Sequence, residues 1–467
     1  MTRTRIVAFA LCVALLSSLA GCFASDNPDA TSPTVLPPGF TASSLYLQAS
    51  DKVNTAESLI LYIGTLKETT VGSQTFSESS QQYLNLQNCN TGSFQASMSE
   101  TLHVGTYDIT VSEAFADGTG YFTVNGSNFT TQMTSEEFRA RYTPTTLFNP
   151  SVYSEVCAVA YGKGICIQFN QPTAAESWAL PQGAVFTDAS GFAILDENGN
   201  LTESNYTVRY TIDGISVSKT TRTVIGSTPA TVNVPSSTEG YTPLDCPYAP
   251  RNLELACGYL LQAQKIGSTL TENIVCQAFS INRTETAVLS MSGLDQTLQA
   301  SLDRIIKQVN ESFGGASTNR TLKELFQNGT YTISEDGSQT TTDESIDSTF
   351  MRKYCQDLLV STIILPAYIS SAAISETDTS YTITFIATDP TLAEAICADI
   401  CYTIYGNATM LDEMASESTP DAVQYTLEVD KRTGMPIKSG IEYGSTHVIW
   451  GISYRLTSTT EQIYQFA

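Results

Sequence analysis

Tyr381-Thr382-Ile383-Thr384-Phe385 is a stretch in which large apolar side chains alternate with threonine, and Ile165-Cys166-Ile167-Gln168-Phe169 shows the same alternation in the first half of the chain. Because successive side chains of a β-strand point to opposite faces, this period of two predicts strands with one buried face. A proline-led segment rich in alanine and glutamate follows each stretch, at residues 172–176 and 390–394, and favours a short helix there. The repeated pair indicates that one structural unit occurs twice.

Further short matches between the two halves occur in the same order. In chain order the pairs are Leu47-Gln48-Ala49 with Leu261-Gln262-Ala263, Gly105-Thr106-Tyr107 with Gly329-Thr330-Tyr331, Phe138-Arg139 with Phe350-Met351-Arg352, Asp196-Glu197-Asn198-Gly199 with Asp430-Lys431-Arg432-Thr433-Gly434, and Gly214-Ile215-Ser216 with Gly451-Ile452-Ser453. We interpret the first pair as helices that open each half, at residues 47–53 and 261–266. The fourth pair is interpreted as turns before closing strands, and those strands contain the fifth pair. A run of matches in constant order favours tandem duplication over chance.

The shared order of elements predicts a mostly β protein of the α+β class, built largely from antiparallel strands. Residues 294–313 are ambiguous, because their apolar spacing fits a helix whereas their place in the repeat requires a strand, and we expect a strand. Residues 23–40 are rich in Ser, Asp and Pro, which is typical of a flexible tether. The predicted organisation is a signal peptide at 1–21, a tether at 22–40, a first repeat at 41–225, a linker at 226–250 and a second repeat at 251–467.

The amino terminus has the parts of an export signal. Arg3 and Arg5 precede an apolar run at 6–16 that is too short to span a bilayer, and small residues lead to Cys22. Leu19-Ala20-Gly21-Cys22 resembles the lipobox of bacterial lipoproteins. That resemblance implies cleavage before Cys22, acylation of its sulfur, and a lipid-anchored protein of the cell envelope whose partner is the membrane. The alternative is an ordinary cleaved signal beside an unrelated cysteine.

The charge balance is strongly acidic. The sequence has 47 acidic and 23 basic side chains, and cleavage after residue 21 would remove only Arg3 and Arg5 from these, leaving a formal charge of −26. Such a charge repels phosphate backbones, so nucleic acid is not expected as a partner. A large negative charge also keeps an exported domain soluble.

The cysteines permit one specific disulfide prediction. Of the 11 cysteines, Cys12 would leave with the signal and Cys22 would carry lipid. Cys157 and Cys166 flank a Tyr-Gly turn that would set them opposite each other in a hairpin, which makes them the best disulfide candidate. No metal site is expected, because neither of the two histidines lies beside a cysteine pair.

The sequence contains none of the common catalytic signatures. A nucleophilic hydrolase needs a base near its serine or cysteine, and only His103 and His447 could serve, both in strand-like surroundings. The acidic turn at residues 196–200 is better explained as a hairpin turn than as a calcium loop, since the spaced acids of such a loop are absent. We therefore expect a non-catalytic protein without a cofactor, and an enzyme that uses paired carboxylates is the alternative.

The lipobox, the tether, the opening helix and the long alternating strands together resemble the periplasmic lipoprotein-carrier superfamily, which includes LolA, LolB and the mycobacterial lipoproteins of the LppX and LprG kind. The resemblance implies two tandem half-barrels of strongly curved antiparallel sheet, each with helices covering its concave face around an apolar cavity. Six residues are the candidate lining of these cavities: Ile165, Ile167, Phe169, Tyr381, Ile383 and Phe385. The alternative is that they are ordinary core.

Two functions follow from these observations. The first is an anchored envelope protein that shelters a lipid or another apolar ligand in each half-barrel without covalent chemistry. The second is a structural or adhesive surface lipoprotein with no small ligand, in which duplication adds reach or avidity.

Overall fold

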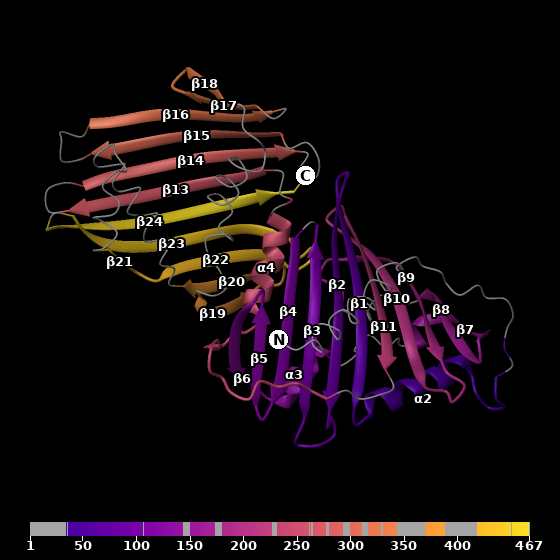
Figure 1. Cartoon of the computed structure of the whole chain (residues 1–467). Helices are drawn as coiled ribbons and strands as arrows, with labels where there is room; N and C mark the ends of the chain where they lie inside the picture. The colour runs from indigo at the N-terminus through magenta and orange to yellow at the C-terminus, as the bar shows by residue number, and fades with distance from the viewer. Residues whose placement is uncertain are drawn as a thin grey trace.

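The computed structural model describes residues 34, 36–105, 107–142, 150–172, 180–226, 231–260, 262, 265–276, 280–292, 299–310, 316–327, 330–342, 369–387, 418–449 and 451–466. In these ranges the chain is mostly β, as predicted, and its strands form two open sheets (Figure 1). No helix among the described residues is long and apolar enough to cross a membrane.

The described helices are few and short. They are α2 (Ala42–Asn54), α3 (Ser135–Tyr142), α4 (Ala249–Leu260) and a 3-10 turn at Pro150–Val152. Thr41 caps α2, because its side chain accepts a hydrogen bond from the Ser44 amide while the Ser44 side chain accepts one from the Thr41 amide. This reciprocal capping satisfies two backbone groups that a helix start leaves unpaired.

The first sheet contains twelve strands in the order β12-β6-β5-β4-β3-β2-β1-β11-β10-β9-β8-β7. Their bounds are β1 (Leu59–Val71), β2 (Gln74–Gln87), β3 (Gln95–Val104), β4 (Tyr107–Ala116), β5 (Thr119–Val124), β6 (Ser127–Gln132), β7 (Tyr153–Tyr161), β8 (Gly164–Pro172), β9 (Val185–Leu195), β10 (Leu201–Ile212), β11 (Ile215–Gly226) and β12 (Thr242–Pro243). All neighbours are antiparallel except the short β12, which runs parallel to β6.

The second sheet has the order β18-β17-β16-β15-β14-β13-β24-β23-β22-β20-β19, and β21 pairs with β23 beside this path. Its strands are β13 (Lys265–Cys276), β14 (Ser280–Ser292), β15 (Gln299–Asn310), β16 (Ala316–Gln327), β17 (Thr330–Glu335), β18 (Ser338–Thr342), β19 (Ile369–Glu376), β20 (Ser380–Ala387), β21 (Ser418–Pro420), β22 (Val423–Asp430), β23 (Pro436–Ile449) and β24 (Ile452–Gln465). The strand predicted within 294–313 is confirmed for 299–310.

The two sheets repeat one topology. When β21 and β12 are set aside, each described strand of one sheet has a counterpart at the same place in the other, so that β1 corresponds to β13 and β11 to β24. The correspondence extends to side chains: Asn125 accepts a hydrogen bond from the Thr110 amide, and Asp336 accepts one from the Thr321 amide. The repeated element order is thus confirmed at the level of topology.

Two of the sequence matches were aligned wrongly. The helix that precedes the second sheet is α4 at 249–260, whereas Lys265 and Ile266, predicted to be helical, begin β13. The Gly-Thr-Tyr motif precedes β4 in the first half but β17 in the second, and β17 corresponds to β5. Both errors arose because common residues recur at strand and helix starts for local reasons, independent of their place in the sheet.

Hairpin turns were predicted more accurately. The segment 196–200 connects β9 to β10, with the Asp196 carboxylate accepting hydrogen bonds from the Asn198 and Asn200 amides, and Asp430 accepts one from Arg432 in the corresponding turn. The predicted helices at 172–176 and 390–394 and the echo of Phe138 at 350–354 lie outside the described residues, apart from Pro172, which ends β8.

The predicted opposition of Cys157 and Cys166 is wrong. The β7–β8 register pairs Cys157 with Gln168 and Val159 with Cys166, so the two cysteines are offset by two residues, and both are free thiols in the structure. The reason is the two-residue turn between Tyr161 and Gly164, which fixes the register. Burial raises the pKa of the Cys166 thiol to about 12.

We define the inner face of the first sheet as the face that carries Leu61, Leu84 and Met98, which pack in one core with α2. Tyr46 of α2 meets Phe169 of β8 edge to face, with ring centroids 5.0 Å apart. Helix α3 adds Phe138, which packs on Phe94 and Phe115. The apolar faces of α2 and α3 are therefore buried against the inner face.

Helix α4 connects the two halves through a shared core. Its Leu253 and Ala256 pack with Phe385 and Tyr425 of the second sheet, and Phe122 of the first sheet joins the same cluster. On its other side α4 approaches β3 so closely that a Cβ at Gly258 would lie 2.6 Å from Val104. Figure 1 shows α4 where the two sheets meet, and the inner face of the second sheet is defined as the face packed on it.

Candidate functional site

The three predicted lining residues of the first half lie on the inner face of β8. Ile167 and Phe169 are fully buried, and Ile165 is partly buried at the edge of the same cluster. Phe169 contacts both Tyr46 of α2 and Tyr153 of β7. These residues form the core beneath α2, and their role as a cavity lining stays a prediction.

The three predicted lining residues of the second half divide between two environments. Ile383 and Phe385 are fully buried in the cluster around α4, where Phe385 stacks on Tyr425. Tyr381 is only partly buried, and burial followed by the negative charge of Glu78 raises its pKa to about 12. Since Glu78 belongs to β2, Tyr381 lies where the two halves meet.

A polar cluster occupies this junction, beginning with a buried ion pair. Arg251 of α4 donates hydrogen bonds from Nε and Nη2 to the two carboxylate oxygens of Glu100, at 2.9 and 3.0 Å. Gln82 donates to the same carboxylate at 2.7 Å, and the Glu100 side chain is 1% exposed. A bidentate pair of this kind fixes orientation as well as charge, so it holds α4 at one place on β3.

Glu78, on the inner face of β2, contacts two residues. The Tyr259 hydroxyl of α4 donates to the Glu78 carboxylate at 2.8 Å, and Lys67 of β1 lies 3.6 Å from it. The Lys67 ammonium also donates to the carbonyl oxygen of Thr433, in the turn between β22 and β23. Lys67 therefore lies between a carboxylate of its own half and a backbone carbonyl of the other.

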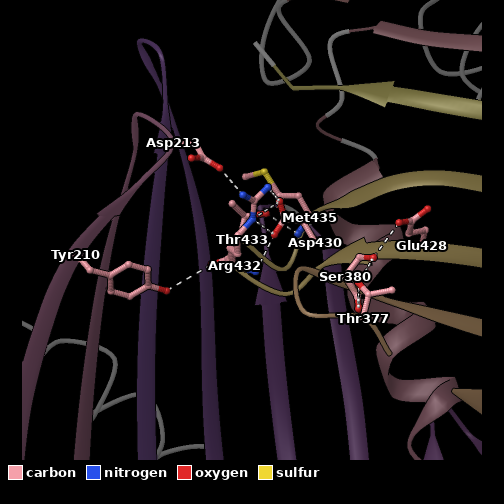
Figure 2. Close-up of polar contacts among 9 residues, drawn as sticks. All are labelled: Tyr210, Asp213, Thr377, Ser380, Glu428, Asp430, Arg432, Thr433 and Met435. Carbon is pink, nitrogen blue, oxygen red and sulfur yellow. Dashed lines mark hydrogen bonds and ion pairs between the residues drawn. The ribbon is translucent and has the colours of Figure 1, made fainter. Parts of the chain in front are cut away.

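The β22–β23 turn is fixed against the first sheet by Arg432 (Figure 2). The Arg432 guanidinium binds Asp430 through Nε and Nη2, at 2.9 and 2.7 Å, and reaches Asp213 in the β10–β11 turn. The Tyr210 hydroxyl donates to the Arg432 carbonyl oxygen at 3.4 Å. Behind the turn Ser380 donates to Glu428 at 2.9 Å, a contact within the second half.

Lys219 completes the polar cluster. It lies on β11 directly opposite Lys67 and on the same inner face, and it keeps access to solvent. Loss of hydration is the main cause that lowers the pKa of Lys219; the charge of Lys67 acts in the same direction and that of Glu78 opposes it. The inner face thus changes along β1 from Leu59, Leu61 and Ile63 to Thr65 and Lys67.

The sequence contained a signal for this cluster that motif searching does not detect. On β1 the inward positions can be followed by the period of two from apolar residues to Lys67, and on β11 the pattern Val217, Lys219, Thr221 places a charge between two buried residues. An inward lysine in an alternating strand indicates an interior with polar content. The contribution of α4 was not predictable, because it comes from the other half.

The histidines show no arrangement for hydrolysis. His447 Nε2 lies 2.6 Å from Ser445 Oγ, but both residues are 0% exposed and two positions apart on one strand, so no substrate reaches the serine. Burial lowers the pKa of His447. His103 is exposed and pairs with Asp108 at 2.6 Å. Within the described ranges no group of three or more potential ligands could hold a metal ion.

No family model and no curated protein matches this sequence. Among solved structures, LprF from Mycobacterium bovis aligns over 45% of this chain and 91% of its own, at 9% identity and a TM-score of 0.24. The MucA/MucB complex of Pseudomonas aeruginosa aligns over 74% of this chain and 89% of its own, at 9% identity and a TM-score of 0.18. At these TM-scores neither fold nor function transfers to this chain.

Proposed function

We propose that this chain is a lipoprotein of the cell envelope, anchored through lipid on Cys22, that binds one amphiphilic molecule on the inner face of the first sheet without covalent chemistry. In this proposal the first sheet curves as a half-barrel around the ligand. Cys22 itself lies outside the described residues.

The observation that carries the proposal is the chemical gradient along the inner face of β1 and β2. Leu61 and Leu84 are fully buried with α2, whereas Lys67 and Glu78 lie six positions away along the same strands, before the buried inward pair Thr69 and Phe76. Between them Ile63, Thr65 and Gln82 are only partly buried. A surface that changes from apolar to charged over this length matches an acyl chain joined to a polar headgroup.

The second half supports a different role for its own inner face. Ser439, Ser445, His447 and Ser458 are all buried to 2% exposure or less, and Ser439 and Tyr464 form a hydrogen bond to each other. Ser445 likewise pairs with His447, so three of these four neutral groups have partners within the second half. We propose that the second half covers the polar part of the first sheet's inner face and binds no ligand of its own. The alternative for the whole chain is a purely structural or adhesive protein.

Mass spectrometry of an organic extract tests the proposal. The chain beginning at residue 22 would carry Cys22→Ser, so that no acyl chain of its own contributes, and it would be purified without detergent from a bacterial host. We expect about one lipid per chain. A clean extract would contradict ligand binding and favour the structural alternative.

The anchor is tested separately. The full-length protein with Cys22→Ser should move from the membrane fraction to the soluble fraction, because several acyl chains give a stable anchor and none remains in the variant. Continued membrane retention would contradict the lipobox interpretation without bearing on ligand binding.

A further inference from the structure

The inner face of the first sheet contains an unfavourable charge arrangement. Lys67 and Lys219 are direct partners in the β1–β11 register, on neighbouring strands and on one face. Directly opposite residues have Cβ atoms about 4.5–5.5 Å apart, and like charges in such pairs are destabilising. Two lysine side chains therefore start from neighbouring positions on the inner face.

Only one of these two cations has a direct ion-pair partner among the described residues. Lys67 has Glu78 at 3.6 Å and the carbonyl oxygen of Thr433. Lys219 has no hydrogen-bond or ion-pair partner among the described residues, and its neighbours on the adjacent inner positions, Val208, Val217 and Thr221, are uncharged. The buried Glu100 on the inner face of β3 is occupied by Arg251.

The position of Lys219 fits the end of an amphiphile. Lys67 lies six positions after Leu61 along β1, which corresponds to roughly 20 Å of strand. Over this length the inner face passes through Thr65 and Ile63 to the apolar core beneath α2. A chain lying along β1 would place its headgroup at the two lysines, and solvent access at Lys219 leaves room for that group.

We propose that Lys219, together with Lys67, binds the anionic headgroup of the amphiphile, a phosphate or a carboxylate. This inference rests on the proposed function and specifies its ligand class. An anion at this place would convert the repulsion between the two lysines into two charge-assisted hydrogen bonds. It would also explain why the chain, at a formal charge of −24, can bind an acidic ligand: the cationic pair is a local exception.

Calorimetric titration of the chain from residue 22 with Cys22→Ser provides the test. The probes are decyl phosphate, 1-decanol with the same alkyl chain, and inorganic phosphate alone. Lys219→Met removes the charge and keeps the side-chain length. Lys163→Met, at the exposed β7–β8 turn, is the matched control for loss of one positive charge.

We expect decyl phosphate to bind at least tenfold more tightly than 1-decanol. Lys219→Met should weaken the binding of decyl phosphate about tenfold and leave the binding of 1-decanol unchanged. Lys163→Met should change the affinity for neither probe. Equal binding of the two alkyl probes, unaffected by Lys219→Met, would overturn the headgroup site and leave amphiphile binding intact. Binding of inorganic phosphate as tight as that of decyl phosphate would show a free phosphate site instead. Absence of binding by either alkyl probe would overturn the proposed function itself.

Discussion

The hairpins β10–β11 and β23–β24 occupy the same place in the two sheets but carry different inner faces. Lys219 and Leu456 each lie four residues after the first residue of the second strand, Ile215 and Ile452. Lys219 reaches solvent, whereas Leu456 is 2% exposed. The two halves share one topology, and this inward position differs between a lysine that reaches solvent and a packed leucine.

The largest expected effect comes from placing the first half's lysine in the second half. Leu456→Lys should lower the free energy of unfolding by about 5 kcal/mol, because it adds a buried charge without a partner and removes a packed side chain. Urea denaturation followed by circular dichroism measures this. A loss below about 1 kcal/mol would mean that the second inner face is as open as the first.

The junction between the halves gives the next largest effect. Arg251→Met should lower the free energy of unfolding by about 3–5 kcal/mol, because it leaves the buried Glu100 carboxylate without its cation. The control is Arg209→Met, whose pair with Asp188 is half-exposed on both sides and should contribute at most about 1 kcal/mol. Equal denaturation midpoints for the two variants would contradict a coupling role for α4.

The buried His447 makes the stability of the second half depend on pH. The pKa of His447 is lowered in the folded protein, so between its ordinary and its lowered pKa the unfolded chain binds more protons. Stability is therefore lost as the pH falls below about 6.5. His447→Gln should reduce this loss between pH 7 and pH 5, measured by thermal unfolding. An unchanged pH slope in His447→Gln would show that other groups cause it.

The smallest expected effect is the reverse exchange. Lys219→Leu should stabilise the unliganded protein by roughly 0.2–1 kcal/mol, because it removes a like-charge cross-strand pair. Lys163→Leu, at a turn, should change stability by less than about 0.5 kcal/mol. A destabilised Lys219→Leu variant would mean that Lys219 has a favourable partner in the native protein, and the proposed headgroup site would lose its physical basis.

Much of the architecture was predictable because the residue pattern within a short segment is enough to indicate a strand. The alternation around Ile167 and Ile383 identified inward positions correctly, and the turns at Asp196 and Asp430 were identified by residues that form turns in any context. The errors concerned register and correspondence. Cys157 and Cys166 were placed opposite each other although the turn shifts them by two residues, and the second opening helix was placed too late.

The sequence by itself determined the strands, their inward faces, the repeated order and the acidic charge, because each depends on the residue types of short segments. Only the tertiary structure decided that α4 serves both halves, that Arg251 finds Glu100, and that the turn at Thr433 meets Lys67. Those contacts join residues far apart in the chain, and their partners are selected by how two sheets pack together. The pair Lys67 and Lys219 depends on both sequence and tertiary structure. The alternation within β1 and β11 places each lysine on the inner face, and the antiparallel register places the two side by side.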